Sequence, residues 1–266
     1  MKDQSRQPVR RCAQPIELVH TDASSRAVVC LHGFTGYPGE LALPAKRLYE
    51  AGFDVFVPRY PGHGTNGKDF LRSRGADWIG EAKRQIESIQ SKYQSISLVG
   101  HSMGGAIAVL MASLYPINRM VLYAPALVLP TLPVKTVKCL SFVIKRKRKE
   151  WHSDPSYPFF DDRDEDDDAF LGSEYWSWIY PKQIAELSDI SKQAVAALES
   201  ITSSILVFTG QEDTVIPQAA GTLVLDRAKG QNNWIHLPKA THLIPYDRDE
   251  ATREEAMERT VLWISG

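Results

Sequence analysis

The sequence predicts an α/β fold with a mostly parallel central sheet, helices on both faces of the sheet, and one inserted segment. Short apolar runs alternate with helical patterns along most of the 266 residues, which is typical of strand-helix-strand units. The alternation stops near residue 126 and resumes near residue 191, and the chain shows no internal repeat. We therefore expect a core made of residues 1–125 and 191–266, with residues 126–190 inserted into it as a cap.

Six apolar runs have the length of buried strands, and apolar residues at helical spacing separate them. The predicted strands are residues 27–31, 53–57, 95–99, 119–123, 204–208 and 234–237. The predicted helices are residues 44–50, 77–93, 102–115, 218–229 and 250–264. Pro44 lies in the first turn of its helix and Gly52 just past the end, and Asp77 is expected to be the N-cap of the next helix.

Positive and negative charges nearly balance in this chain. Lysine and arginine number 31, and aspartate and glutamate 32, which gives a net charge of −1. Such a chain has no general field that attracts nucleic acid or an anionic membrane, so we expect neither nucleic acid nor a stable membrane anchor. Residues 1–14 are polar and basic, unlike a secretory signal, and glycines and a proline interrupt the apolar stretch 96–117. We expect a cytoplasmic protein, and its oligomeric state stays open.

Cysteine and histidine spacing predicts neither a disulfide framework nor a metal site. Cys12, Cys30 and Cys139 are odd in number and far apart in the sequence. Cys30 lies in an apolar run and is expected to be a small core residue. His63 lies in a tight turn, residues 60–64 (YPGHG), with no second ligand at metal spacing, so we expect a buried structural histidine.

The strongest local signal is the hexapeptide GHSMGG at residues 100–105, which follows a predicted strand and opens a predicted helix. This is G-x-S-x-G at a strand-turn-helix junction, where Ser102 is exposed as a nucleophile on a strained backbone. Gly100 and Gly104 lack the Cβ atoms that would clash at such a sharp turn. The pattern predicts that Ser102 is a catalytic serine.

A serine hydroxyl is a weak nucleophile and needs a base. The chain has seven histidines, and His242 alone lies in a loop after the last predicted strand. His236 lies inside that strand and is expected to be structural, and the side chain of His101 should point away from the site because it adjoins Ser102. We therefore predict that His242 is the base.

The base needs an anion that fixes its tautomer and stabilises its charged form. Asp213 lies on the loop after the predicted strand 204–208, at the sheet edge where sites of open α/β sheets form. Glu212 is a rival, although adjacent side chains point in different directions, and Asp189 is a weaker reserve candidate. We predict the triad Ser102, Asp213 and His242, in that chain order.

The tetrahedral intermediate of acyl transfer needs two N–H donors aimed at its oxyanion. The backbone N–H of Met103, the residue after the nucleophile, is the first predicted donor. The second should come from the loop HGFTG at residues 32–36, where the N–H of Phe34 is the candidate. His32 and Gly33 are expected to shape this loop rather than take part in catalysis.

Five motifs in this order, HGFTG, PGHG, GHSMGG, GQED and ATH, resemble those of the α/β-hydrolase superfamily. The resemblance spans the chain from Ala27 onward, and it is greatest to bacterial carboxylesterases and monoacylglycerol lipases with a small cap between the sixth and seventh strands. It implies an α/β-hydrolase fold, the same triad, and the same two oxyanion donors. It also implies that the side chains of Phe34 and Met103 face the acyl pocket. The cap departs from the family pattern because it is long and heavily charged.

The predicted cap is rich in aromatic residues, with ten of them between residues 126 and 190. They either form an apolar lid over a lipophilic acyl chain or give a small cap its own core, and the sequence does not separate these two interpretations. Trp176 and Trp178 lie in the densest aromatic cluster and are the predicted substrate-binding residues of the cap.

Two charge blocks also lie in the cap, a basic one at residues 145–149 (KRKRK) and an acidic one at residues 161–168 (DDRDEDDD). The simplest interpretation is that both are solvated. The alternative is that they attract each other and hold the cap closed.

These residues predict a serine hydrolase that cleaves carboxylic esters through an acyl-enzyme, with no metal or organic cofactor. The expected substrates are small, lipophilic, short- to medium-chain esters, including monoacylglycerols. The same triad could serve a thioesterase, an amidase or peptidase, or an acyltransferase. A non-catalytic ligand-binding protein is a rival of a different class, which the presence of all three triad residues disfavours.

Overall fold

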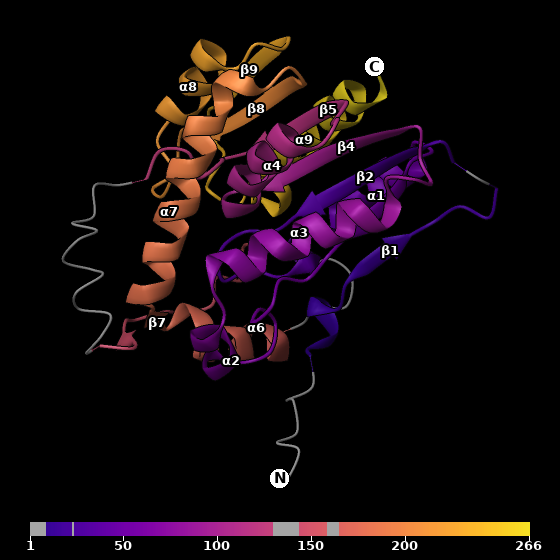
Figure 1. The fold of residues 1–266 in the computed structure, drawn as a ribbon. Coiled ribbons are helices and arrows are strands. Elements are labelled where there is room, and N and C mark those ends of the chain that lie inside the picture. Colours follow the sequence, from indigo (N-terminus) through magenta and orange to yellow (C-terminus); the bar gives the residue numbers. More distant parts are fainter. Residues whose placement is uncertain (1–8, 23, 130–143, 159–164) are drawn as a thin grey trace.

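A computed structural model of the chain describes residues 9–22, 24–129, 144–158 and 165–266. Within these residues, seven strands form one sheet in the order β1-β3-β2-β4-β5-β8-β9 (Figure 1). β1 is antiparallel to β3, and all other neighbours are parallel. The strands are β1 (Ile16–Leu18), β2 (Arg26–Leu31), β3 (Asp54–Val57), β4 (Ser95–His101), β5 (Arg119–Tyr123), β8 (Ser204–Gly210) and β9 (Asn232–Leu237).

All six predicted strands are present, and their ends differ from the predicted ends by no more than two residues. Five of them, β2, β3, β4, β5 and β8, lie inside the sheet, where both faces are covered and a continuous apolar run is required, whereas β9 is an edge strand. Cys30 shows this, since it is fully buried in β2 as expected. The edge strand β1 was not predicted, because three residues are too few to give a periodic pattern.

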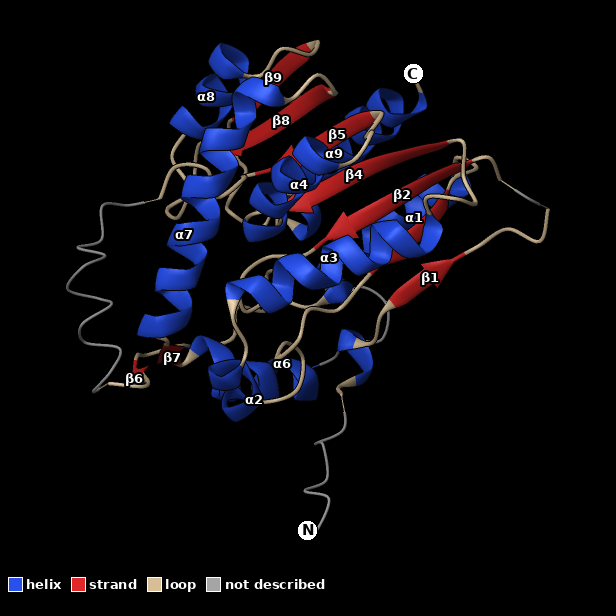
Figure 2. Cartoon of the chain, in the orientation of Figure 1, coloured by secondary structure: helices blue, strands red, loops and turns tan. Residues whose placement is uncertain are grey.

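Helices cover both faces of the sheet (Figures 1 and 2). One face carries α3, α4 and α7, which pack against one another, and the other carries α1 and α9, which also touch each other. The helices of this core are α1 (Ala42–Glu50), α3 (Gly75–Ile89), α4 (Met103–Leu114), α7 (Pro181–Ala197), α8 (Ala219–Arg227) and α9 (Glu250–Ser265). A shorter helix, α2 (Gly67–Arg72), precedes α3.

The prediction that Asp77 is an N-cap is wrong. Helix α3 begins at Gly75, with Arg74 in the N-cap position, and Asp77 is the third residue of the helix. Its carboxylate accepts a hydrogen bond from the Arg74 backbone N–H at 2.9 Å. An acidic side chain can accept from a free backbone N–H either as the N-cap or as the third residue of the helix. Asp77 therefore marks the start of α3, but the helix begins two residues before it.

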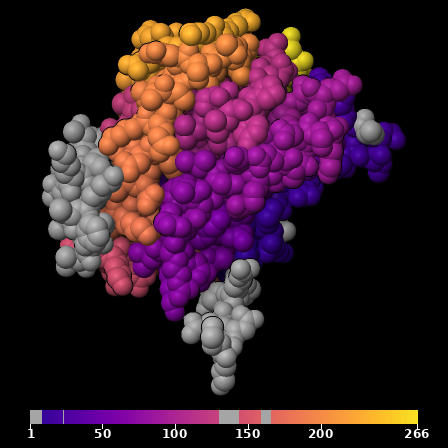
Figure 3. Space-filling view, in the orientation of Figure 1, coloured from indigo at the N-terminus to yellow at the C-terminus, as the bar shows by residue number. Residues whose placement is uncertain are grey.

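Helix α7 was not predicted, and it extends through residue 190, where the predicted cap ends. It lies beside α3 and α4, and the space-filling view shows it in orange next to the purple early part of the chain (Figure 3). The helix therefore belongs in part to the segment expected as cap and in part to the layer that covers the sheet.

The described elements of the predicted cap before α7 lie between residues 144 and 180. They are the two-stranded sheet of β6 (Lys147–Arg148) and β7 (Trp178–Ile179), and the helix α6 (Glu165–Leu171), which continues into a turn of π-helix (Gly172–Trp176). Residues 145–149 are exposed, as expected of a solvated basic block. In the described part of the acidic block, Asp167 pairs with Arg10 at 2.8 Å. Residues 161–164 lie outside the described residues.

Two further expectations concern single residues. His63 is fully buried in a cluster of aromatic rings, and burial lowers its pKa to about 3, as fits a structural histidine. Cys12 is a buried free thiol like Cys30, whereas Cys139 lies outside the described residues.

Of the helices that the structure describes, none combines the length and the apolar character needed to cross a membrane.

Candidate active site

Ser102 lies between β4 and α4 on a strained backbone, with φ of 52° and ψ of −114°. A non-glycine residue with positive φ is uncommon and marks a constrained turn. The two flanking glycines make the turn possible. A Cβ on Gly104 would lie 1.9 Å from the carbonyl oxygen of Leu31, and one on Gly100 would lie 2.6 Å from the carbonyl oxygen of Gly104. The strand and helix can therefore approach only at glycine, as predicted.

The backbone of Ser102 is fixed from the neighbouring strand. Its N–H donates to the carbonyl of Tyr123 at 2.9 Å, and its own carbonyl accepts from the N–H of Ala126 at the same distance. These bonds attach the turn to the end of β5, so the serine does not depend on its own loop for its position. The side chain of Ser102 is aimed into a pocket at the carboxyl edge of the sheet.

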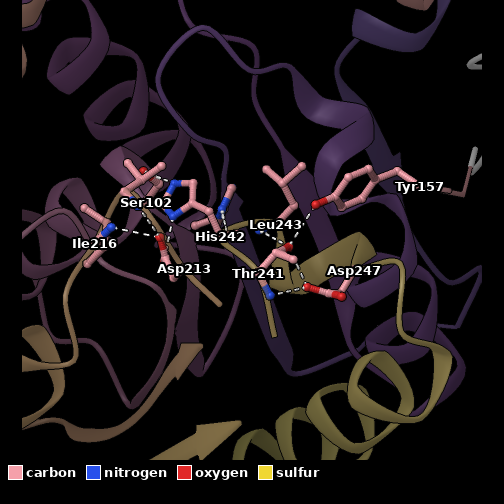
Figure 4. A network of polar contacts seen from close by, with 10 residues as sticks. Ser102, Tyr157, Asp213, Ile216, Thr241, His242, Leu243 and Asp247 are labelled. Atoms are coloured by element: carbon pink, nitrogen blue, oxygen red, sulfur yellow. Dashed lines mark hydrogen bonds and ion pairs between the residues drawn. The ribbon is translucent and has the colours of Figure 1, made fainter. Parts of the chain in front are cut away.

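The structure brings Ser102, His242 and Asp213 together in one line of hydrogen bonds (Figure 4). His242 Nδ1 lies 2.9 Å from Asp213 Oδ2, and His242 Nε2 lies 3.1 Å from Ser102 Oγ. A carboxylate only accepts, so Nδ1 carries the ring proton and Nε2 is free to accept from the serine hydroxyl. This is the tautomer that a general base requires.

Asp213 is held as an anion by several donors. Its Oδ1 accepts from the backbone N–H groups of Val215 at 2.7 Å and of Ile216 at 2.8 Å, while Oδ2 faces His242. Burial alone would raise the pKa of Asp213. The hydrogen bond and charge of His242, with the two backbone donors, outweigh burial and hold that pKa below its usual value. The carboxylate therefore stays charged where it faces the imidazole.

The pKa of His242 is lowered from its ordinary value of 6.5. Burial is the largest cause, the hydrogen bond to Asp213 acts in the opposite direction, and the charge of His101 lowers the pKa further. The imidazole is consequently neutral at neutral pH and ready to accept a proton.

The rival anions lie elsewhere. The side chain of Glu212 is 47% exposed and pairs with Arg248 at 2.9 Å, pointing away from the imidazole that its neighbour Asp213 contacts. Asp189 lies on α7, away from this cluster. Adjacent residues in a loop project to different sides, which is why only one of the two acids after β8 reaches His242.

His101 does not point away from the site as expected. Its Nε2 lies 2.9 Å from the backbone carbonyl oxygen of His242, and the two imidazole rings are 5.1 Å apart between centroids. The reason is that β4 extends through residue 101, so this side chain projects from the end of a strand toward the neighbouring loop instead of following the turn.

The loop of residues 32–36 lies beside Ser102. Tyr60 N–H donates to His32 Nε2 at 3.3 Å, and His32 Nδ1 in turn lies 3.0 Å from the Gly33 carbonyl, so His32 shapes the loop as expected. Thr35 has φ of 58°, a second strained non-glycine residue. Among the described residues, the backbone N–H of Phe34 has no acceptor, which leaves it available to a ligand.

Met103 is the first residue of α4, where a backbone N–H has no partner within the helix. Its side chain is fully buried and is not among the residues that line the pocket next to Ser102, whereas Phe34 does line it. The two predicted oxyanion donors therefore differ in what their side chains can contact.

A pocket of about 580 Å³ opens above Ser102. Its walls come from the loops that carry Phe34 and His242 and from described residues of the predicted cap. Trp176 lines it, as predicted, together with Trp151 and Tyr157. Trp178 is not among the lining residues, since its ring stacks under the guanidinium of Arg146 at 3.9 Å.

The aromatic residues of the predicted cap fall into two groups, those that face the pocket and those that are buried. Trp151, Tyr157 and Trp176 face the pocket. Tyr175 and Tyr180 are buried and contact the ring of Phe70 on α2, forming a small core beneath the cap.

Two hydrogen bonds attach the predicted cap to the catalytic loops. The indole N–H of Trp176 donates to the backbone carbonyl of Thr35 at 3.3 Å. The hydroxyl of Tyr157 donates to Thr241 Oγ1 at 3.2 Å, one residue before His242 (Figure 4). Thr241 Oγ1 also donates to the buried Asp247 at 2.7 Å. The predicted cap therefore contacts each loop at one residue, Thr35 next to Phe34 and Thr241 next to His242.

Trp151 completes the aromatic wall and depends on a glycine. Its ring lies 5.3 Å from that of Trp176 between centroids. A Cβ on Gly172 would lie 2.0 Å from the Trp151 ring, so only glycine at this position lets the ring lie across the π-helical turn.

A family model described as serine aminopeptidase, S33, matches residues 22–249 of this chain. The chain belongs to this family. The match covers Ser102, Asp213 and His242 and the predicted cap. The family and the α/β-hydrolase fold that the motifs implied are both confirmed.

Several proteins that the chain resembles over nearly its whole length are named as lipases or come from work on lipolytic enzymes. The thermostable monoacylglycerol lipase of Bacillus sp. (strain H-257) is 24% identical over 245 residues, which are 91% of this chain and 92% of the relative. A solved structure from work on two metagenome-derived lipolytic enzymes, LipS and LipT, has a TM-score of 0.82 at 22% identity and covers 97% of this chain and 99% of the other. For the monoacylglycerol lipase of Paleococcus ferrophilus the TM-score is 0.73, at 22% identity, with coverage of 94% and 97%.

Sequence reasoning within this S33 chain missed Trp151, Tyr157 and Thr241 at the site, and also Glu40, which is buried beneath it. Trp151 and Tyr157 lie in an irregular stretch without periodicity, so no local signal points to them. Thr241 could have been found from its place next to His242 in the motif ATH.

Proposed function

We propose that this chain hydrolyses carboxylic esters through an acyl-enzyme formed on Ser102, with His242 as general base and Asp213 as its partner. The observation that carries the proposal is the unbroken hydrogen-bonded line from Asp213 through His242 to a serine on a strained turn. The chain is a carboxylic ester hydrolase of its family, since relatives that match about nine-tenths of its length are named monoacylglycerol lipases.

The first step is acylation. His242 Nε2 accepts the proton of Ser102 Oγ as this oxygen attacks the ester carbonyl carbon, and Asp213 stabilises the imidazolium that forms. The lowered pKa of His242 keeps the ring neutral before this step. The alkoxide of the leaving alcohol then takes the proton back from Nε2, and the acyl group stays on Ser102.

The oxyanion of the tetrahedral intermediate is stabilised by the backbone N–H groups of Phe34 and Met103. The free N–H of Phe34 and the helix position of Met103 support this assignment. Losing one such donor typically costs about 3 kcal/mol of transition-state stabilisation. Deacylation repeats the sequence, with water in place of serine and with the carboxylic acid as the product.

We infer that the substrates are monoesters with short- to medium-chain acyl groups, including monoacylglycerols. A pocket of about 580 Å³ accommodates a small ester, and the aromatic side chains of Phe34, Trp151 and Trp176 offer apolar contact to an acyl chain. Trp178 contributes indirectly, since its N–H donates to the Ser173 carbonyl within the cap. A cytoplasmic location and the absence of nucleic-acid partners stay predictions from the sequence.

The decisive experiment compares the wild type with Ser102→Ala. The wild type should hydrolyse p-nitrophenyl butyrate, and a serine-directed phosphonate should label it once per chain. The alanine variant should show neither turnover nor labelling, with an unchanged circular dichroism spectrum. If the variant keeps activity within about tenfold of the wild type, the assignment of Ser102 is wrong.

A matched panel of ester, thioester and anilide with one acyl group then defines the bond that is cleaved. We expect the ester to have the highest kcat/KM. A series of p-nitrophenyl esters of increasing chain length should show a maximum at short or medium chains and a fall when the chain exceeds the pocket. A preference for the anilide would instead indicate a peptidase.

A further inference from the structure

Beneath the triad lies a buried carboxyl group that the mechanism does not use. Glu40, in the 3₁₀ turn Pro38–Leu41 before α1, is 6% exposed. Among the described residues, no lysine or arginine forms an ion pair with it. Its Oε2 accepts from the Gly33 backbone N–H at 3.0 Å and lies 3.4 Å from His101 Nδ1. Burying a carboxyl group without a cationic partner costs free energy of folding. We therefore asked what the two contacts of Glu40 contribute.

The neighbouring glycines leave room for this carboxyl group. A Cβ on Gly36 would lie 2.0 Å from Glu40 Oε1, and a Cβ on Gly33 would lie 3.2 Å from His101 Nδ1. The glycines of the HGFTG loop therefore permit the loop to rest directly on Glu40 and His101. The loop that carries the predicted oxyanion donor Phe34 is thereby supported from below.

The contacts of His101 fix where its protons lie. Its Nε2 is 2.9 Å from the backbone carbonyl oxygen of His242, and a carbonyl can only accept, so Nε2 carries a proton. The other nitrogen, Nδ1, faces Glu40 Oε2. Without a proton between them, two lone pairs would face each other in a site where both side chains are almost fully buried. A proton on either atom would turn this contact into a hydrogen bond.

From this arrangement we propose that Glu40 and His101 are positioning residues that connect the oxyanion loop to the base loop. Glu40 holds the Gly33 N–H, His101 holds the His242 carbonyl, and the contact between their side chains joins the two. The inference rests on the proposed function, because it assigns these loops their catalytic roles. Neither residue reacts with substrate.

The effect on catalysis follows from geometry. The Phe34 N–H and His242 Nε2 lie on loops that are far apart in the sequence, and both must be aligned with Ser102 in the transition state. A displacement of about 1 Å can lower the rate about 100-fold. Both side chains line the pocket, and a buried contact between them restricts the relative motion of the two loops. Its loss should misalign the reacting groups and so lower kcat rather than raise KM.

The test uses paired substitutions at each residue. His101→Leu removes the donor to His242, while His101→Gln supplies an amide N–H that can replace it. Glu40→Met removes both polar contacts of the carboxyl group, while Glu40→Gln can accept from Gly33 and donate to His101 Nδ1. We expect kcat to fall about 10- to 100-fold in the leucine and methionine variants, with KM within about threefold of the wild type. The glutamine variants should regain most of the loss.

A second measurement does not depend on activity. In protein labelled with ¹⁵N at the histidine rings, the signals lost in His101→Leu identify His101. We expect Nε2 to be protonated in the wild type, and the ¹⁵N signal of Nδ1 to shift in Glu40→Met because the contact with the carboxyl group is lost. A wild-type spectrum with Nε2 unprotonated would overturn the inference even if a variant failed to fold.

The kinetic outcomes are equally decisive. If both apolar variants keep kcat within about twofold of the wild type, the two residues only fill space and the inference is wrong. If the wild type hydrolyses no ester, the proposed function fails, whereas the ring spectrum still decides where the proton lies.

Discussion

The indole N–H of Trp176 donates to the backbone carbonyl of Thr35, a residue held at positive φ next to Phe34. A cap side chain therefore stabilises a strained position in the loop that carries a proposed oxyanion donor. The predicted cap supports that loop and also forms part of the pocket wall.

Trp176→Phe should lower kcat about two- to tenfold, because it keeps the ring and removes one hydrogen bond worth about 0.5–1.5 kcal/mol. Trp178→Phe is the matched control. It removes an indole donor of the same kind, which bonds only to Ser173 within the cap. Steady-state kinetics on one ester compares the two, and equal losses would contradict a specific role for the bond to Thr35.

The pH dependence of kcat/KM should follow His242. The base acts in its neutral form, and burial lowers its pKa below 6.5, so activity should rise with pH through a midpoint below 6.5 and be flat at neutral pH. In Asp213→Asn the ring loses the partner that fixes its tautomer, and kcat should fall about 10⁴-fold. A wild-type midpoint well above 6.5 would show that another group controls the reaction.

Thr241 should contribute to stability through Asp247. The threonine hydroxyl and backbone N–H both donate to Asp247 Oδ2 at 2.7 Å, and Asp247 is fully buried. Thr241→Val removes the hydroxyl at nearly constant volume, and the free energy of unfolding should fall by about 1–3 kcal/mol. Thr241→Ser keeps the hydroxyl and should lose clearly less. Urea denaturation measures both, and identical values would exclude the hydroxyl as the cause.

Gly104→Ala should destabilise the fold severely. Its new Cβ would lie 1.9 Å from the carbonyl oxygen of Leu31, and neither backbone can move without separating α4 from β2. We expect the free energy of unfolding to fall by about 3 kcal/mol or more. Gly80→Ala is the control, since Gly80 is also helical and its Cβ meets only a flexible arginine end at 3.5 Å. That variant should be unchanged or more stable by up to about 1 kcal/mol.

The strands and the triad were predictable because their signals are local. A buried parallel strand needs a continuous apolar run, and the turn at Ser102 needs glycines at fixed offsets on either side. Asp213 and His242 each follow a strand at the carboxyl edge of the sheet, so their neighbourhood follows from topology alone.

The supports of the site were not predictable from such signals. Tyr157 contacts Thr241, 84 residues away in the sequence, and Trp176 contacts Thr35, 141 residues away. Nothing periodic marks either side chain, because Tyr157 lies in an irregular segment and Trp176 in a single turn of π-helix. The misjudged direction of His101 has the same origin, since it depends on β4 extending two residues beyond its apolar run.

The shape of the pocket next to Trp151 depends on the small size of Gly172. The Trp151 ring occupies the volume that any side chain at residue 172 would need. A single added methyl would therefore push an indole aside and reshape the entrance, while leaving the reacting serine, imidazole and carboxylate untouched. The range of substrates that this fold accepts can therefore change without any change in the reacting groups. Replacing one hydrogen atom of Gly172 by a carbon atom is enough.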